Sequence, residues 1–311
     1  MRALLPARLP TRLPALARLL ALGLLLAVVT VVVPDSATPP DDVTVVAMPH
    51  ARGLDGSDRT VWILAVGSDA RPGQDMTRSR GDALQLVGLD TRTGAAASIG
   101  IPRDMWVPIP GHGSNRVNAA LYFGGPRLLG RTVAAYVGIR PDYVMVTRFT
   151  YFEQMIRDIG GITVHNPRAF ADEFLKPKGF PAGTIRLGGY DAMAFSRIRH
   201  SLPGGDYDRS ANQQRVLRGI AARVRQRADQ PGFLERGALS VLRHTHADAS
   251  PAELFTLAQA VAQVQPSRIT TCVLRGSFAT IGGASVIRPD VAYARRLARA
   301  ARRDATLPRH C

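Results

Sequence analysis

The hydrophobic residues of this chain alternate repeatedly between the spacing of buried strands and the spacing of helices. Short continuous apolar runs bounded by turn residues are typical of buried strands, and apolar residues three and four positions apart are typical of helices. We therefore predict strands over 61–67, 82–89, 95–101, 143–149, 162–165 and 268–274. We predict helices over 126–137, 151–159, 189–195, 210–228, 251–264 and 290–303, with one more strand over 195–199. Strands and helices that alternate with short links indicate one α/β domain built around a layered sheet.

A longer apolar run near the N-terminus has a different meaning. Residues 19–33 contain one Thr and no charged side chain, four arginines precede them, and the first acidic residue is Asp35. The run is short for a membrane span unless the residues before it take part, and a cleaved signal peptide is the alternative. We favour an uncleaved signal anchor, because no convincing small-x-small cleavage site follows. The arginine-rich flank then stays in the cytoplasm and the rest lies outside, in a single-pass membrane protein.

This topology divides the chain into five parts. They are a basic cytoplasmic tail over 1–18, a transmembrane signal anchor over 19–34, a flexible linker over 35–58, an extracytoplasmic domain over 59–306 and a tail over 307–311. Both cysteines lie in the exported part, where a disulfide between Cys272 and Cys311 would tie the C-terminus to the domain. We favour this disulfide over the alternative of one buried thiol and one free terminal thiol.

The charge of the chain indicates an anionic partner. The 311 residues carry a formal net charge of +16, and nearly all the basic side chains are arginines. Nucleic acid, an anionic membrane and a phosphorylated substrate all fit such a charge. The predicted export, together with the lack of a helix-turn-helix or aromatic stacking motif, argues against a nucleic-acid-binding regulator.

Charged residues gather at the ends of the first three predicted strands. If these strands run up, down and up, then Asp69, Asp82 and the pair Arg103 and Asp104 all lie at one edge of the sheet. Strand ends are where α/β proteins usually bind ligands. Two carboxylates that meet there repel each other unless a cation lies between them, and ligands that are all oxygen suit Mg²⁺ or Mn²⁺. For any one of these residues alone, a solvated turn is the simpler interpretation.

Two further pairs of polar residues have the spacing of a shared face. On the strand predicted over 195–199, Arg197 and Arg199 point to the same side, and two parallel guanidiniums form a fork for a diphosphate. Arg209 and Gln213 are four residues apart at the start of a predicted helix, whose N-terminus favours an anion. A solvated basic strand and a capped amphipathic helix are the simpler interpretations of these pairs.

Taken together and in this order, the motifs of the chain resemble those of the LytR–CpsA–Psr (LCP) family of envelope glycopolymer transferases. The resemblance covers roughly residues 60–300. The matching segments are 64–69 (LAVGSD), 80–82 (RGD), 101–104 (IPRD), 116–120 (RVNAA), 160–162 (GGI), 197–199 (RIR) and 205–209 (GDYDR) with Gln213 and Gln214.

The resemblance implies a fold and a reaction. The expected fold class is α/β, a single three-layer α-β-α domain with a central mixed sheet, preceded by an N-terminal transmembrane helix. A hydrophobic groove is expected to hold a polyprenyl chain. The family moves a glycan phosphate from polyprenyl diphosphate to a sugar hydroxyl of peptidoglycan, so the expected partners are a polyprenyl-diphosphate-linked glycan, a peptidoglycan acceptor and the membrane. Pyrophosphatase activity on the polyprenyl diphosphate is a second activity that the resemblance leads us to expect.

The resemblance also assigns roles to residues. Asp69 and Asp82 match the aspartates linked to Mg²⁺ (or Mn²⁺), and we predict catalytic roles for Arg103 and Asp104, with Asp104 orienting Arg103 or the acceptor hydroxyl. The residues that match the diphosphate-binding set are Arg80, Arg103, Arg197, Arg199, Arg209 and Gln213. Two positions depart from the family pattern: Ala83 stands where a hydroxyl residue is common, and Asn212 stands where an arginine is common. The second interpretation of the chain is a non-catalytic extracytoplasmic binder of a lipid diphosphate or an anionic polymer.

Overall fold

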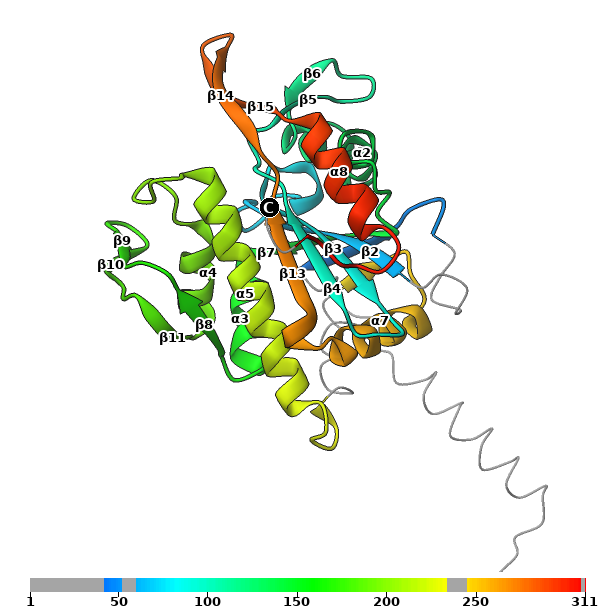
Figure 1. The fold of residues 1–311 in the computed structure, drawn as a ribbon, viewed down its shortest axis with the longest axis vertical. Helices are drawn as coiled ribbons and strands as arrows, with labels where there is room; N and C mark the ends of the chain where they lie inside the picture. Colours follow the sequence, from blue (N-terminus) through cyan, green and yellow to red (C-terminus); the bar gives the residue numbers. More distant parts are fainter. Residues whose placement is uncertain (1–41, 52–59, 234–244, 309–310) are drawn as a thin grey trace, which may run out of the picture. The chain divides into compact units, whose positions relative to one another are not determined.

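Seven strands form the central sheet, in which parallel and antiparallel neighbours are mixed (Figure 1). The computed structural model describes residues 42–51, 60–233, 245–308 and 311. From one edge to the other, the sheet contains β12 (Thr245–Ala247), β1 (Val43–Ala47), β7 (Tyr143–Arg148), β2 (Thr60–Ser68), β3 (Gly81–Asp90), β4 (Ala96–Gly100) and β13 (Ile269–Val273). Strand β3 is antiparallel to both β2 and β4, whereas β2 is parallel to β7 and β4 is parallel to β13.

Helices cover both faces of the sheet and complete three α-β-α layers. Helices α2 (Ala119–Val137) and α8 (Val291–Ala301) share one core with Leu64 and Leu86 of the sheet. The neighbouring Ile63 and Val87 point to the other face, into a smaller core that includes Ala260 of α7 (Pro251–Gln263). Successive side chains of a strand alternate between faces, so a sheet buried on both sides needs the continuous apolar runs that the sequence contains. The predicted α/β domain with a mixed sheet is confirmed.

The remaining elements surround this sheet. Three more helices, α3 (Phe149–Asp158), α4 (Gly189–Arg197) and α5 (Asp206–Arg227), gather on one side (Figure 1). The short strands of the described ranges pair in twos: β5 (Trp106–Pro108) with β6 (Ser114–Arg116), β8 (Ile162–Asn166) with β11 (Gly183–Leu187), β9 (Phe170–Asp172) with β10 (Lys176–Phe180), and β14 (Gly276–Ile281) with β15 (Ala284–Pro289). Two 3₁₀ turns, η1 (Met76–Arg78) and η2 (Pro266–Arg268), lie in connections.

Helix α7 begins as the sequence predicts. The Ser250 Oγ accepts a hydrogen bond from the Glu253 backbone N at 3.2 Å, and the Glu253 carboxylate accepts one from the Ser250 backbone N at 2.8 Å. This reciprocal pair is a capping box, which satisfies backbone donors that the first turn leaves free. Two other helices begin before their predicted limits. Helix α5 starts at Asp206, and α2 starts at Ala119 and contains non-helical backbone at Gly124 and Gly125.

The predicted limits of the domain are wrong at both ends. Residues Val43–Ala47, which we assigned to the flexible linker, form β1 between β12 and β7. The run VTVVA is rich in β-branched residues, which favour a strand. The Pro and Asp residues around the run are what indicated a linker instead. At the other end, Leu307, which we assigned to the tail, is 2% exposed and packs in the core with Ala305.

The disulfide between Cys272 and Cys311 is confirmed, with 5.9 Å between the two Cα atoms. It joins Cys311 to β13, the strand at one edge of the sheet. The predicted cytoplasmic tail and signal anchor, 1–34, lie outside the described residues, as does most of the predicted linker. Within the ranges that the structure describes, no helix combines the length and the apolar character that a membrane span requires.

The topology gathers several strand ends at one edge of the sheet. Strands β2 and β7 run in the same direction, and their last residues, Ser68 and Arg148, are paired. Strand β4 also ends at this edge, because β2 and β4 are both antiparallel to β3, and β3 begins there. The predicted up-down-up path of the first three strands is therefore confirmed, and it places the loops after β2 and β4 beside Asp82.

Candidate active site

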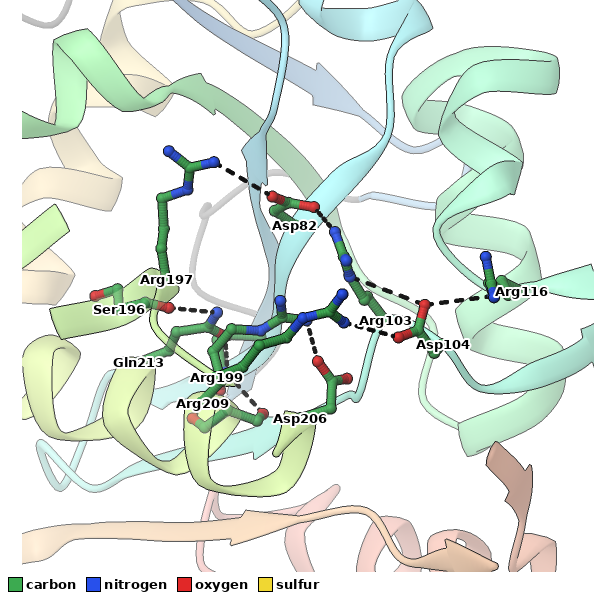
Figure 2. A network of polar contacts seen from close by, with 12 residues as sticks. Asp82, Arg103, Asp104, Arg116, Ser196, Arg197, Arg199, Asp206, Arg209 and Gln213 are labelled. Carbon is green, nitrogen blue, oxygen red and sulfur yellow. Dashed lines mark hydrogen bonds and ion pairs between the residues drawn. The ribbon is translucent and has the colours of Figure 1, made fainter. Parts of the chain in front are cut away.

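Asp82, near the start of β3, contacts arginines from two distant parts of the chain (Figure 2). Its Oδ1 accepts a hydrogen bond from Nη1 of Arg103, which follows β4. Its Oδ2 lies 3.9 Å from Nη2 of Arg197, in the last turn of α4. The ring of Phe149 lies beneath Arg197, with 4.4 Å from the guanidinium carbon to the ring centroid, and this cation–π contact helps to orient the arginine.

Asp104 is the second carboxylate of the network, and three guanidiniums surround it (Figure 2). Its Oδ2 is 3.2 Å from Nη1 of Arg199, and its Oδ1 is 3.4 Å from Nε of Arg116 and 3.8 Å from Nε of Arg103. The Nε atoms of Arg103 and Arg116 are buried and make no hydrogen bond within the described structure. Burial opposes the charge of Arg103, but Asp82, Asp104 and Asp206 outweigh it and raise the pKa of Arg103. Arg103 therefore stays charged, and its Nε–H remains available to donate a hydrogen bond.

The interpretation of Arg197 and Arg199 as neighbours on one strand face is wrong. Residues 195–197 continue α4, and the chain leaves the helix at Ile198 with extended backbone angles. The aromatic and β-branched residues of 195–199 suggested a strand, but Phe195 and Ile198 are buried against the second core of the domain instead. Arg197 thus comes from a helix and Arg199 from the loop after it, and each contacts a different aspartate.

A buried ion pair joins the network from the start of α5. Asp206 is 7% exposed and Arg209 is 4% exposed, and the two side chains are hydrogen-bonded across one helical turn. Burial raises the pKa of Asp206, and the charge of Arg209 opposes this effect. Burial also lowers the pKa of Arg209, which Asp206 counteracts. Asp206 is a network residue that the sequence motifs do not predict, although its position three residues before Arg209 on a helix is a usable signal.

Asp69 closes the loop between β2 and β3. Its Oδ1 accepts a hydrogen bond from the Arg80 backbone N at 3.0 Å, and its own backbone N donates to the Arg80 carbonyl at 3.1 Å. Burial and then the nearby charge of Asp82 raise the pKa of Asp69, while the Arg80 hydrogen bond and the charges of Arg103 and Arg80 oppose the rise. The two carboxylates predicted to bind a metal ion therefore lie close enough to repel each other. The Arg80 side chain is exposed.

The carboxylates of Asp69 and Asp82 fit a divalent ion whose remaining ligands come from a phosphorylated substrate and water. The described residues contain no cluster of three or more His, Cys, Asp or Glu side chains that could hold a metal by themselves. Mg²⁺ commonly takes one or two protein carboxylates and completes its coordination with phosphate oxygens and water. Asp69 and Asp82 supply two such carboxylates beside several arginines, so the residues match that mode of binding rather than a closed protein cage.

The raised pKa of Asp69 predicts a pH dependence of stability. The folded protein keeps a proton on Asp69 at pH values where the unfolded chain, with a pKa of about 4, has released it. In buffer without divalent cations, the free energy of unfolding should therefore fall as pH rises through the window just above 4. We expect Asp69→Asn to remove this component of the slope in urea titrations at several pH values. An unchanged slope in the variant would contradict the assignment.

Buried amides hold α5 against the sheet directly below the site. Gln213 Nε2 donates to the Ser196 carbonyl at 3.2 Å, and its Oε1 accepts from Gln85 Nε2 at 3.0 Å. Gln214 Nε2 donates to the carbonyls of Cys272 and Ser98 at 2.7 and 3.1 Å. Both ends of the Gln213 amide are occupied, so in this structure Gln213 positions the helix. The sequence motifs do not identify Gln85 as a partner of Gln213, although a polar amide inside the apolar run ALQLV indicates a specific buried role.

Gly100, the last residue of β4, marks the close approach of α5 to the sheet. A Cβ placed there would lie 2.3 Å from the Ser210 Oγ and 3.0 Å from Gln214 Nε2. We expect Gly100→Ala to lower the free energy of unfolding by about 1–3 kcal/mol, because α5 must move to make room. Adding Ser210→Ala removes the nearest atom and should restore part of the loss in denaturant titrations. Equal stability of wild type and Gly100→Ala would show that the helix accommodates the methyl group freely.

A small cavity of about 20 Å³ adjoins Asp82, Ala83, Phe149, Ser196, Arg197, Arg209 and Gln213. A cavity of this size holds a water molecule at most, so a polyprenyl chain could enter here only if side chains moved. A larger cavity of about 690 Å³ lies at the opposite edge of the sheet, among residues such as Pro49, Gly138 and Pro141, and it shares no residue with this network. The hydrophobic groove expected for the lipid thus remains a prediction.

The structure brings most of the predicted site residues into one network. Those that share ion pairs, hydrogen bonds or the small cavity are Asp82, Arg103, Asp104, Arg197, Arg199, Arg209 and Gln213. Asp69 and Arg80 lie beside them. Arg116, which matched a motif but was assigned no role, contacts Asp104. Of the two departures, Ala83 lines the cavity, and Asn212 is buried with its Oδ1 accepting from Arg215 Nη1 at 2.7 Å.

This arrangement of carboxylates and guanidiniums at one sheet edge has the charges that a phosphorylated ligand would need. The model of the LytR_cpsA_psr family matches residues 39–302, so the chain belongs to that family. It is 31% identical to the Staphylococcus aureus regulatory protein MsrR over 166 residues, which are 53% of this chain and 49% of MsrR. It is 32% identical to the Bacillus anthracis polyisoprenyl-teichoic acid–peptidoglycan teichoic acid transferase TagU over 161 residues, 51% of each chain.

Solved structures share the fold. B. subtilis TagV superposes with a TM-score of 0.68 at 24% identity, over 81% of this chain and 99% of that chain. TagT with bound octaprenyl pyrophosphate lipid superposes with a TM-score of 0.61 at 22% identity, over 80% of this chain and 91% of that chain. The chain matches about half the length of the curated relatives named above.

Proposed function

We propose that this protein is a Mg²⁺-dependent phosphotransferase of the cell envelope. It would move a glycopolymer phosphate from a polyprenyl diphosphate carrier to a sugar hydroxyl of peptidoglycan. The observation that carries the proposal is the convergence, at one sheet edge, of Asp82, Arg103 and Asp104 with arginines of α4, α5 and the loop between them. The teichoic acid transferase named among the relatives, and the octaprenyl pyrophosphate in a structure of the same fold, support the class of substrate.

The residues suit phosphoryl transfer, which depends on charge neutralisation and positioning more than on a special nucleophile. Arg103 and Arg197 would bind the diphosphate oxygens in place of Asp82, and Arg199 would bind these oxygens with the nitrogens that do not contact Asp104. Asp69 and Asp82 would then hold Mg²⁺, which supplies positive charge to the phosphate oxygens. Asp104 contacts both Arg103 and Arg199, so it would keep these two guanidiniums oriented.

The bonds that change follow from the substrates. The acceptor hydroxyl oxygen forms a bond to the phosphorus of the sugar-bearing phosphate, and the bond from that phosphorus to the bridging oxygen breaks. Polyprenyl phosphate leaves with the electron pair of the broken bond, and the hydroxyl proton passes to solvent or to the departing phosphate. Arginines around both phosphates stabilise the charge that builds on the leaving group.

The position of Asp42 supports a site that lies near the membrane. The carbonyl of Asp42 accepts a hydrogen bond from the backbone N of Arg148, the last residue of β7, so Asp42 lies at the edge that carries the site. If the apolar run is an anchor that ends at residue 34, the eight residues from there to Asp42 span at most about 30 Å. An anchored protein would therefore keep its site within reach of a lipid-linked donor.

The test is a turnover assay on a defined polyprenyl-diphosphate glycan, with a peptidoglycan fragment as acceptor, with and without Mg²⁺. We expect glycan phosphate to appear on the acceptor, together with polyprenyl phosphate, only when Mg²⁺ is present. Tight binding of the donor without turnover under any of these conditions would favour the non-catalytic binder. Turnover that persists after chelation would remove the metal from the proposal but leave the transfer.

A further inference from the structure

The β14–β15 hairpin extends from the sheet edge that carries the candidate site (Figure 1). Residues directly opposite each other in an antiparallel pair share a face, and the register pairs Phe278 with Ile287 and Thr280 with Ser285. One face of the hairpin therefore carries an aromatic ring and two hydroxyl side chains in a row. Ile287 is buried, whereas Phe278 is 67% exposed.

Backbone contacts connect this hairpin to the site. The backbone N of Ile287 donates to the carbonyl of Asp104 at 3.0 Å, and Met105 pairs with Ile287. Arg116, whose Nε lies 3.4 Å from the Asp104 carboxylate, donates from Nη2 to the Ser285 carbonyl at 2.8 Å. The hairpin face is thus continuous with the residues around Asp104.

A tyrosine of α5 orients the exposed ring. The hydroxyl of Tyr207 donates to the Gly276 carbonyl at 2.7 Å, and its ring meets Phe278 edge to face, with 5.7 Å between centroids and an interplanar angle of 78°. Tyr207 follows Asp206 directly, so the ring of Phe278 is held at a defined position relative to the buried ion pair. A side chain kept exposed by such contacts has its surface available to a ligand.

We propose that the hairpin face with Phe278, Thr280 and Ser285 binds the acceptor glycan. This inference rests on the proposed transferase function. A sugar ring has apolar C–H faces and a rim of hydroxyls, so an exposed aromatic ring flanked by Thr and Ser hydroxyls matches it chemically. Phe278 stacks on one sugar of the acceptor, and the next sugar along the chain then extends toward the Asp104–Arg116 ion pair.

The arrangement fits a glycan better than a membrane surface. A hairpin that inserts into lipid carries its large apolar side chains at the tip, whereas the tip here is Gly282 and Gly283. Phe278 lies two residues from the base of the hairpin, beside Tyr207 and close to the site. If replacing Phe278 by Ala abolishes binding to lipid vesicles and leaves binding to the glycan unchanged, the face would be assigned to the membrane.

The test compares Phe278→Ala, Phe278→Trp and the control Phe174→Ala in the full-length protein. Phe174 is also a strongly exposed phenylalanine, 87% exposed, but it lies between β9 and β10, whose Lys176 contacts Asp191 at the end of α4 remote from Arg197. We expect Phe278→Ala to weaken binding of a soluble peptidoglycan glycan fragment about tenfold in calorimetry and to raise the acceptor KM equally. Phe278→Trp should restore most of the loss, and Phe174→Ala should match wild type.

Three results would overturn the inference. They are unchanged glycan binding by Phe278→Ala, an equal effect of Phe174→Ala, or an equal rise of the donor and acceptor KM values, which indicates a general disturbance of the site. Failure of the proposed function looks different. Wild type would then bind the glycan fragment through Phe278 but would not transfer phosphate to it, and the calorimetric comparison would still decide the role of the hairpin.

Discussion

Asp82→Asn is expected to lower kcat by about 100- to 1,000-fold, the range found when one preorganised electrostatic group is removed from an active site. Asp82 contacts Arg103 and Arg197 and lies beside Asp69, so its charge serves both the arginines and the proposed metal. An amide keeps the shape but binds Mg²⁺ poorly. The donor lipid should still bind, because Arg103 and Arg197 lose a competing carboxylate. Steady-state turnover and donor binding, measured at the same Mg²⁺ concentration, separate the two effects.

The matched control for this variant is Asp248→Asn. Asp248 is an exposed aspartate that also pairs with an arginine, Arg127 at 2.8 Å, and neither residue belongs to the site network. Its replacement should leave kcat within error of wild type. If Asp82→Asn turns over as fast as Asp248→Asn, then Asp82 has no part in the chemistry, and the proposed metal site must be abandoned.

Loss of the disulfide is expected to have the largest effect on stability. Cys272 and Cys311 are 39 residues apart, and closing a loop of that length restricts the unfolded chain by about 4 kcal/mol in the chain-entropy model. Cys311→Ser should lower the free energy of unfolding by an amount of this order in guanidinium titrations. The Cys272 carbonyl also accepts the Gln214 hydrogen bond, so loosening β13 should disturb the packing of α5 below the site.

Two comparisons check this expectation. The double variant Cys272→Ser/Cys311→Ser should resemble the single variant, because either change opens the same loop. Wild type treated with dithiothreitol should also unfold at the lower denaturant concentration. If oxidised and reduced wild type unfold at the same midpoint, then the link does not restrict the unfolded chain, and the packing of Leu307 and Ala305 alone holds the C-terminal segment.

Local sequence patterns predicted the elements that bring the site together. The turn at 90–94 reverses the chain because the Asp90 carboxylate accepts hydrogen bonds from the backbone N of Arg92 and Thr93, at 2.9 and 3.0 Å. This information lies within four residues, so it is readable from the sequence. The apolar runs on either side of this turn predict two buried strands, β3 and β4. The up-down-up order of β2, β3 and β4 then places Asp69, Asp82 and Arg103 at one edge of the sheet.

Other features depended on residues far away in the chain. The VTVVA run became an inner strand only because β7 and β12 lie on either side of it. Residues 195–199 have the composition of a strand, yet the helix continues to Arg197 because Ala194 and Phe195 pack into the core with Ile156 and Val164. Tertiary packing outweighed local propensity in both segments.

The sequence by itself determined the α/β architecture, the family and the set of charged residues at the sheet edge, because these depend on short-range periodicity and on motifs of a few residues. Only the tertiary structure decided which of the distant arginines contacts Asp82 and which contacts Asp104, and that the β14–β15 hairpin meets Asp104. Such pairings join residues up to 183 positions apart, as in Ile287 with Asp104. Long-range contacts of this kind arise from the packing of whole elements, and no local pattern encodes them.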